Sequence, residues 1–283
     1  MATGRMAMAC LVMTAGLASG VAMAQAPGAG AASPRPGVID LWTAGKTAFG
    51  VFVPVDNPAP RGPNRGAAVY SVAGGQALAK NPLLDFVFLN LEGRYDRDAV
   101  MAISEGLGKK GTPGRKTMLV RIPSMVDAGP QVTLQRIKEI LAMGADGVTL
   151  PHVETLDQGR QAVSLFADAR ANVWSPANPT GTVIAMLMLE DPGAMAQSQA
   201  IADIGGYSVL ACGIGSLTGA LQGDRLAAEK SNQELLTETK RVKLVNMITA
   251  SKDDVALRVK EGFLGLLVPN DEVIKAGRAA AGR

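Results

Sequence analysis

Short runs of apolar, mostly β-branched residues recur along the chain and alternate with longer segments of helical periodicity. Each run is bounded by glycine, proline or charge, and most are continuously apolar, which is typical of parallel strands covered on both faces. The runs that we interpret as strands are 49–55, 86–92, 116–123, 147–153, 182–190, 207–213, 242–248 and 262–268.

The segments between these runs carry apolar residues at helical spacing. Several begin near a residue suited to cap a helix, such as Asp96, Thr155 or Ser251, and Gly144 and Gly262 stand where a helix end needs positive φ. The predicted helices are 68–80, 96–107, 132–143, 156–169, 192–204, 220–240, 252–260 and 271–280.

Eight strand–helix units in a row predict an α/β protein with a single (β/α)8 TIM barrel over residues 38–283. An open doubly wound sheet is the alternative. It is disfavoured because no Gly-x-Gly-x-x-Gly follows the first predicted strand.

The first residues have the pattern of a secretory signal peptide. Arg5 precedes an apolar run, and Ala22-Met23-Ala24 forms a small-residue cleavage site. A membrane anchor is the alternative, which Gly16 and Gly20 disfavour. We therefore expect a signal peptide over 1–24, a flexible linker over 25–37 and export to the periplasm or the medium, with no membrane attachment after cleavage.

The composition of the chain limits which classes of protein and which metal sites it can form. The balance of 28 basic and 25 acidic residues disfavours a nucleic-acid-binding protein. One histidine and two cysteines cannot supply the four ligands of a structural zinc site or a disulfide framework. Any metal is therefore expected to need oxygen ligands.

Chemistry in a (β/α)8 barrel occurs at the C-terminal ends of the strands. The polar residues there are Asp56, Asn57, Asn90, Glu92, Arg121, His152, Glu190, Asp191, Cys212, Ser216, Asn246, Thr249 and Asn270. The planar fork of Arg121 suits a carboxylate or phosphate, with a rim salt bridge as the alternative. Glu190 ends a long apolar strand, where a carboxylate needs a cation or a close partner.

His152 is the only imidazole in the chain, so any histidine-dependent proton transfer must use it. A structural role at a strand end is equally compatible with the sequence. Cys212 is better explained as a packing residue than as a nucleophile. The glycine-rich turn from Gly213 to Ser216 could present backbone N–H groups to an anion.

Five segments stand in an order and spacing shared with a known family. They are FVFLNLEG (86–93), KTMLVRIP, KEILAMGADGVTLPHVETLDQG, VIAMLMLED and LACGIGSLTGAL. From about Leu41 to Gly282 the chain resembles the HpcH/HpaI aldolase/citrate lyase family, metal-dependent class II pyruvate aldolases. The resemblance implies a TIM barrel of the phosphoenolpyruvate/pyruvate-binding type.

The resemblance also implies a mechanism. A divalent cation, Mg²⁺ or Mn²⁺, held by one Glu and one Asp, acts as a Lewis acid on a 2-keto acid, an Arg stabilises oxyanion charge and a His moves the proton. Arg121 and Glu190 stand at the positions of that Arg and that Glu. Arg121 is therefore predicted to be catalytic and substrate-binding, with Gly213 and Ser216 beside the substrate.

Several family positions are changed in this chain. Ser216 stands where the second metal ligand, an Asp, is expected, and Gly93 stands where the catalytic His is expected. Asn90 replaces an Asp, and Ala142 replaces the carboxylate that would support the missing His, whereas Glu92 is retained. We therefore expect a rearranged site.

Other residues could restore what is lost. Ser216 could act as a weak metal ligand, and Glu92 or Asp191 could turn inward to complete the metal site. His152 could have taken over as the catalytic base. Asn90 and Tyr95 are the remaining supporting candidates.

Three functions follow as hypotheses. The first is a secreted carbon–carbon lyase acting on a 2-keto acid with a divalent cation. The second is a catalytically inactive periplasmic barrel that binds a small carboxylate. The third is a metal-independent lyase that uses His152 and Tyr95.

The resemblance further implies a homo-oligomer in which the last helix packs on a neighbour. Two long connections, 56–65 and 172–181, are predicted to lie beside the barrel mouth as lids or interface elements.

Overall fold

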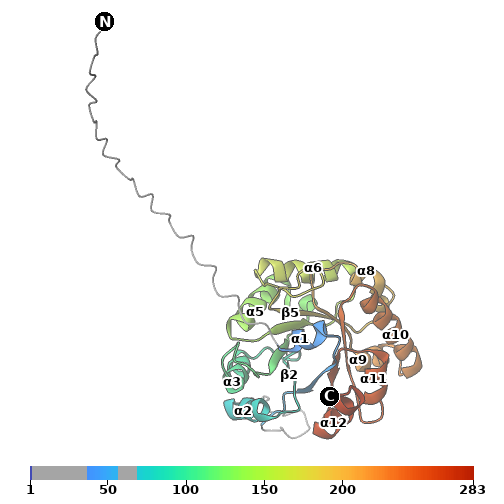
Figure 1. Ribbon diagram of the computed structural model, residues 1–283. Coiled ribbons are helices and arrows are strands. Elements are labelled where there is room, and N and C mark those ends of the chain that lie inside the picture. Colours follow the sequence, from blue (N-terminus) through green and yellow to red (C-terminus); the bar gives the residue numbers. More distant parts are fainter. Residues whose placement is uncertain (2–36, 57–68) are drawn as a thin grey trace. The chain divides into compact units, whose positions relative to one another are not determined.

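Eight parallel strands close into a barrel in the order of the sequence, with β1 paired to β8 (Figure 1). The computed structural model describes Met1 and residues 37–56 and 69–283. The strands are β1 (Ala48–Phe52), β2 (Phe86–Asn90), β3 (Thr117–Arg121), β4 (Gly147–Leu150), β5 (Ile184–Leu189), β6 (Val209–Cys212), β7 (Val245–Thr249) and β8 (Gly265–Leu267). The predicted (β/α)8 TIM barrel is confirmed.

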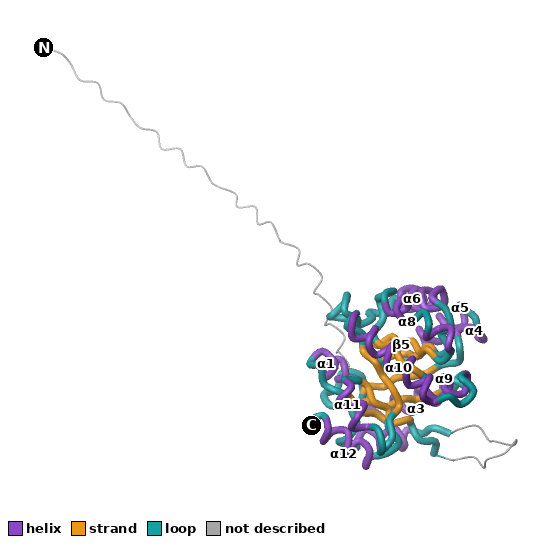
Figure 2. The backbone as a smooth tube through the Cα atoms, turned by 90° about the vertical axis from the view of Figure 1, so that its right-hand side faces the viewer, coloured by secondary structure: helices purple, strands orange, loops and turns teal. Residues whose placement is uncertain are grey.

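Helices surround the strands (Figure 2). Following the strands in turn, they are α2 (Val72–Lys80), α3 (Arg97–Leu107), α4 (Met125–Ala128), α5 (Pro130–Ala142), α6 (Leu156–Asp168), α7 (Pro192–Met195), α8 (Ser198–Ala202), α9 (Ile214–Ala220), α10 (Arg225–Arg241), α11 (Val255–Glu261) and α12 (Asp271–Ala280). Two expected helices are broken: 192–204 divides into α7 and α8, and the chain turns at Gly223, with φ of 91°, before α10.

Two helices begin at the residues that the sequence predicts as their caps. Asp96 and Thr155 cap α3 and α6 by accepting hydrogen bonds from Ala99 N–H and Gln158 N–H. The predicted cap Ser251 is wrong, because the helix begins after Asp254 and the Ser251 N–H donates to the Asp254 carboxylate.

The apolar core forms two layers separated by the strands. Alternate strand residues such as Phe86 and Phe88 fill the barrel interior, whereas Val87 and Leu89 pack outward against the helices. Both sets are buried, which explains why the strands are continuously apolar.

A short helix that the sequence analysis did not predict closes the amino end of the barrel. In α1 (Gly37–Thr43), Val38, Ile39 and Trp42 are buried in the interior cluster. The Trp42 indole N–H donates to the Leu264 carbonyl at 2.8 Å, just before β8 begins. The barrel is thus plugged at one end, which leaves its carboxyl end for a site.

The connection 172–181 lies at the plugged end, so its predicted place beside the mouth is wrong. Trp174 packs on Trp42 with ring centroids 5.9 Å apart. The physical reason is topological: this segment leads from a helix into β5, and such connections lie at the amino ends of barrel strands. Of the other connection, residues 57–65 lie outside the described residues.

Among the residues that the structure describes, no helix is long and apolar enough to cross a membrane. The predicted signal peptide and linker, apart from Met1 and Gly37, lie outside the described residues.

Candidate active site

Four titratable side chains meet at the carboxyl ends of four neighbouring strands. Arg121 is the last residue of β3, and Glu190 follows β5 directly. Glu92 and His152 each follow their strand, β2 and β4, by two residues. Since these strands are consecutive in the barrel, the chain topology alone brings the four residues to one side of the mouth.

Arg121 joins the two carboxylates. Its Nη2 lies 2.9 Å from Glu190 Oε2 and 3.2 Å from Oε1, and it also donates to Glu92 Oε1. Arg121 and Glu190 are only 8% and 4% exposed, so the pair is held where solvent screens it little. Arg121 Nε is fully buried and has no hydrogen-bond partner, and no described residue accepts from Nη1. Nη1 is therefore the guanidinium nitrogen that remains available to a ligand.

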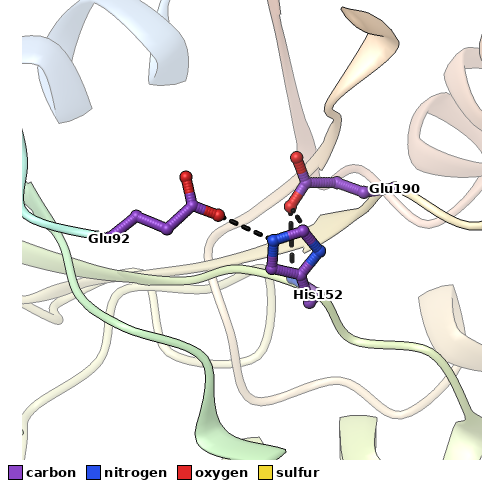
Figure 3. Close-up of side chains that lie close together, drawn as sticks. All are labelled: Glu92, His152 and Glu190. Carbon is purple, nitrogen blue, oxygen red and sulfur yellow. Dashed lines mark hydrogen bonds and ion pairs between the residues drawn. The ribbon is translucent and has the colours of Figure 1, made fainter. Parts of the chain in front are cut away.

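The His152 ring lies between the same two carboxylates (Figure 3). Nε2 is 2.7 Å from Glu92 Oε1, and Nδ1 is 3.3 Å from Glu190 Oε2. The His152 backbone N–H also donates to Glu190 Oε2 at 3.2 Å. Its φ of 53° places it in the left-handed region, which costs a residue with a side chain about 1–3 kcal/mol. This strained backbone turns the imidazole toward the glutamates.

Two residues of the cluster, Arg121 and Glu190, line a cavity of about 190 Å³ inside the barrel mouth, whereas Glu92 and His152 do not line it. Arg121 and Glu190 form its charged wall, and the other side chains are mainly apolar. The apolar side chains are Phe52, Phe88, Met186, Met188, Ala211, Ile214, Met247, Ile248 and Leu267. Such a cavity combines a few polar groups that fix orientation with apolar walls that exclude water.

Gly213 and Ser216 also line this cavity, as expected for residues beside a substrate. A Cβ at Gly213 would lie 2.3 Å from Glu190 Oε1, so only glycine leaves room for the carboxylate where it is. Ser216 lies in α9 and is exposed, and the structure gives it no hydrogen bond to Glu190.

Three predicted supporting residues lie outside the cluster. Asn90 accepts a hydrogen bond from the Glu92 N–H, and Asp191 caps α7 by accepting from the Gly193 N–H. The Tyr95 hydroxyl donates to Glu139 at 3.0 Å. Burial and this hydrogen bond raise the pKa of Tyr95 to about 12. Tyr95 is therefore hydrogen-bonded to α5, and the structure gives it no contact with His152.

Cys212 lines the cavity but is a poor nucleophile. Burial, and then the negative charges of Glu229 and Glu190, raise the pKa of its thiol to about 12. The thiolate is the reactive form, so this environment agrees with a packing role.

The sequence analysis missed the contact between Glu92 and His152 and the apolar cavity wall. The first depends on the backbone conformation at His152, for which the sequence carries no signal. The second follows from alternation along the strands, since Phe88, Met186 and Met247 all belong to the interior cluster.

Glu92, His152 and Glu190 could hold a metal ion, because one ligand atom from each lies within 4.8 Å of the others. Two carboxylates and an imidazole form a donor set that divalent cations accept in proteins.

Comparison with known proteins identifies the architecture. No family model matches the sequence, and no curated protein matches it. Among solved structures, an HpcH/HpaI aldolase from Desulfitobacterium hafniense DCB-2 superposes with a TM-score of 0.62 at 17% identity, covering 86% of this chain and 93% of the other. The chain has the fold of the HpcH/HpaI aldolases.

Two further structures bear this out. The citrate synthase SbnG covers 88% of this chain and 96% of its own, at 15% identity and a TM-score of 0.63. A citrate lyase beta subunit from M. tuberculosis, complexed with oxaloacetate and magnesium, superposes with a TM-score of 0.56 at 17% identity. The match covers 86% of this chain and 100% of the subunit. At identities this low, the superpositions establish that the chain shares the barrel fold of these proteins, and no more than that.

Proposed function

We propose that this protein makes or breaks a carbon–carbon bond of a 2-keto acid at the barrel mouth. The observation that carries the proposal is the buried Arg121, which is fixed by two glutamates through Nη2, lines the cavity and has no described acceptor at Nη1. A 2-keto acid offers the anionic oxygens that a guanidinium fork binds best. The fold shared with aldolases and a citrate lyase subunit supports this assignment.

Arg121 binds and orients the substrate in this proposal. Its positive charge stabilises the negative charge that develops on the keto oxygen when the carbon–carbon bond breaks. The burial of Glu190, the apolar walls and the plugged amino end keep this charge in a poorly solvated place, where such stabilisation is strongest.

The residues fit a divalent cation in part. Glu92, Glu190 and His152 would hold it, and Ser216 would contribute at most through water. When bound, the cation would act as a Lewis acid on the keto acid. The imidazole favours Mn²⁺ over Mg²⁺, which prefers oxygen ligands. Arg121 Nη2 bonds both carboxylates, so a bound cation would share their oxygens with the guanidinium.

His152 has two chemically distinct roles open to it. As a metal ligand it would use a ring nitrogen, whereas as a general base it would take the substrate proton with Glu92 steadying the imidazole. The 2.7 Å contact between Nε2 and Glu92 supports the second role.

Calorimetry with Mn²⁺ and oxalate, followed by a retro-aldol assay that detects pyruvate from hydroxy-keto acids, tests the proposal. We expect metal-dependent oxalate binding and turnover. Turnover should fall about 100-fold or more in Arg121→Ala, as when one oxyanion donor is removed. Glu190→Gln, which replaces a carboxylate ligand by an amide, should weaken metal-dependent oxalate binding and turnover together. Arg160→Ala, an exposed arginine on α6, serves as the control.

The His152→Ala variant separates its two roles. Loss of turnover with Mn²⁺ affinity retained indicates the base, and loss of Mn²⁺ affinity indicates the ligand. Wild-type protein that neither binds oxalate nor releases pyruvate would overturn the proposed function.

A second candidate is carboxylate binding without turnover. The contacts within the cluster favour this function, because Arg121 and His152 already contact both glutamates. Oxalate binding that is independent of metal, in a protein that releases no pyruvate, would support this function over the lyase.

A further inference from the structure

A separate cavity of about 310 Å³ lies at the plugged, amino end of the barrel. Its walls come from α1, from the connection 172–181 and from the residues around the starts of β7 and β8. None of these lining residues lines the cavity at Arg121. A ligand bound here would therefore not be the substrate of the barrel mouth.

The walls of this amino-end cavity are mainly apolar and aromatic. Trp42 and Trp174 line it side by side with their rings tilted by 31°, and Pro176 and Leu264 add to the apolar surface. A concave site with such walls and a few polar groups is the usual form of a small-molecule site. The two indoles favour a ligand with an aromatic ring.

Hydrogen bonds within the connection 172–181 fix the shape of the cavity. The Asn178 side chain donates to the Val173 carbonyl at 2.7 Å, and its backbone N–H donates to the Ser175 carbonyl at 2.9 Å. A Cβ at Gly181 would lie 2.2 Å from the Trp174 nitrogen, so only glycine permits this close approach. The Trp174 wall is therefore preformed.

Two buried donors on the wall have no acceptor in the described part of the chain. Trp174 is 8% exposed, and its indole N–H donates to no described group, whereas the Trp42 indole N–H is bonded to Leu264. The Ser175 hydroxyl accepts from the Asn178 N–H at 3.2 Å, but its own proton is not donated to any described residue. Buried donors normally have a partner. These two therefore indicate a ligand that brings an acceptor.

Lys243 supplies the charge of the cavity. It is exposed, and its ammonium has no partner among residues 37–56 and 69–283. No acidic residue of these ranges lines the cavity. On the adjoining helix ends, Asp203 and Glu238 are both paired with Arg241, at 2.7 and 2.6 Å, and Asp40 of α1 lines a different cavity. The expected acceptor is therefore an anion.

Lys243 stands where the backbone favours glycine. It follows α10 with φ of 62°, in a turn where the Leu244 N–H donates to the Thr239 carbonyl at 2.9 Å and the Lys243 N–H donates to the Lys240 carbonyl at 3.2 Å. Glycine is the usual residue at this position of such a helix end. Lys243 can therefore be replaced by glycine without loss of the fold.

We propose that this cavity binds a small aromatic carboxylate. The ring lies against Trp42 and Trp174. The carboxylate accepts hydrogen bonds from the Trp174 indole and the Ser175 hydroxyl and pairs with Lys243. This site is independent of the function proposed for the Arg121 cavity.

Matched ligands test the proposal by calorimetry. Benzoate and 2-naphthoate are each compared with the primary amide of the same ring, which keeps the shape and removes the charge. We expect at least one acid to bind about fivefold or more tightly than its amide, because its carboxylate makes charge-assisted contacts. Cyclohexanecarboxylate, which keeps the charge without the aromatic ring, should bind more weakly than benzoate.

Lys243→Gly should lower the acid-to-amide ratio toward one while the protein stays folded. Arg170→Gly is the matched control, because Arg170 is also exposed and basic, follows α6 with φ of 54° and does not line this cavity. It removes the same charge from the same kind of backbone position and should leave the ratio as in wild type.

Nitrogen–proton NMR locates the bound acid. The chain has two tryptophans and hence two indole N–H signals. The signal that Trp174→Phe removes should move when 2-naphthoate is added. This variant keeps an aromatic ring but lacks the donor, so it should also bind the acid more weakly.

Three results would overturn this site: equal affinity for acid and amide in both pairs, a ratio unchanged in Lys243→Gly, or 2-naphthoate that competes with oxalate for the barrel mouth. Its failure is distinguishable from failure of the keto acid site. A protein that binds 2-naphthoate at Trp174 but no oxalate would retain this site and lose the proposed lyase.

Discussion

Arg121 and Arg258 are two buried arginines with opposite amounts of free hydrogen-bonding capacity. Arg258, 4% exposed, lies between α10 and α11 and forms a bidentate pair with Glu229 at 2.6 and 2.7 Å. It also contacts Glu261 at 3.0 Å and lies over the Phe263 ring. Its hydrogen bonds to Glu229 raise the pKa of the guanidinium. Arg121 directs all its described contacts through Nη2 and borders a cavity.

The difference teaches how to distinguish a structural from a functional buried charge. Both residues are buried and both contact carboxylates, two at Arg121 and three at Arg258. What differs is whether both ends of the fork are occupied by protein. Arg258 ties two helices together, whereas Arg121 keeps donors beside an open space.

The largest expected effect is on stability at Arg258. Arg258→Ala should lower the free energy of unfolding by about 3–5 kcal/mol, because Glu229, Glu261 and Asp254 lose their shared buried partner. Arg121→Ala should cost less than this, since it leaves two carboxylates rather than three without a partner, and Glu190 keeps the hydrogen bond from the His152 N–H.

Urea denaturation of both variants measures the difference. Arg241→Ala, at an exposed pair, is the control and should leave stability close to that of the wild type. Equal losses for Arg258→Ala and Arg121→Ala would show that Arg121 is also mainly structural.

A smaller effect is expected at two glycines of the Arg121 side. Gly213→Ala should cost about 1–3 kcal/mol, because its Cβ would displace Glu190, and oxalate binding should weaken with it. Gly215→Ala is matched to it: a Cβ there meets nothing within 4 Å, so the change should stay within about 1 kcal/mol.

Thermal unfolding measures the stability of both glycine variants, and calorimetry measures their affinity for oxalate. If both variants bind oxalate as wild type does, Glu190 does not need its present position.

The smallest expected effect is a pH dependence at the Arg258 side. Although burial alone would raise the pKa of Glu229, hydrogen bonds from Arg258 and Gln233 lower it below its usual 4.5. A carboxyl with a lowered folded-state pKa contributes stability above its unfolded pKa and loses it as the pH falls further. Stability should therefore decline as the pH drops below about 4.5.

Glu229→Gln should flatten this acid limb in pH-dependent urea titrations. The exposed Glu234→Gln on the same helix should not. If Glu229→Gln leaves the loss of stability at low pH unchanged, other carboxyl groups cause that loss.

The sequence predicts the barrel well because its signals are local and repeated. Continuous apolar runs mark the strands, and the topology then places Arg121, His152 and Glu190 at one mouth without further information. The segment from Gly37 to Thr43 escapes prediction because seven residues are too few to show helical periodicity.

The details of the site depend on information that the sequence does not display. Asp191 and Tyr95 sit near the mouth in sequence, yet a helix cap and a bond to Glu139 hold their polar atoms elsewhere. The meeting of His152 with Glu92 depends on one left-handed backbone conformation. Position along a strand can be predicted, but the direction of a side chain beyond the strand cannot.

The plug at the amino end has a spectroscopic consequence. Trp42 of α1 and Trp174 are the only two tryptophans in the chain, and they pack against each other there. Intrinsic fluorescence of this protein therefore reports the seating of α1 rather than events at Arg121. A fluorescence change that precedes the loss of helical circular dichroism on heating would record the release of α1 before the barrel unfolds. The chain thus carries its own optical probe of one end of the barrel.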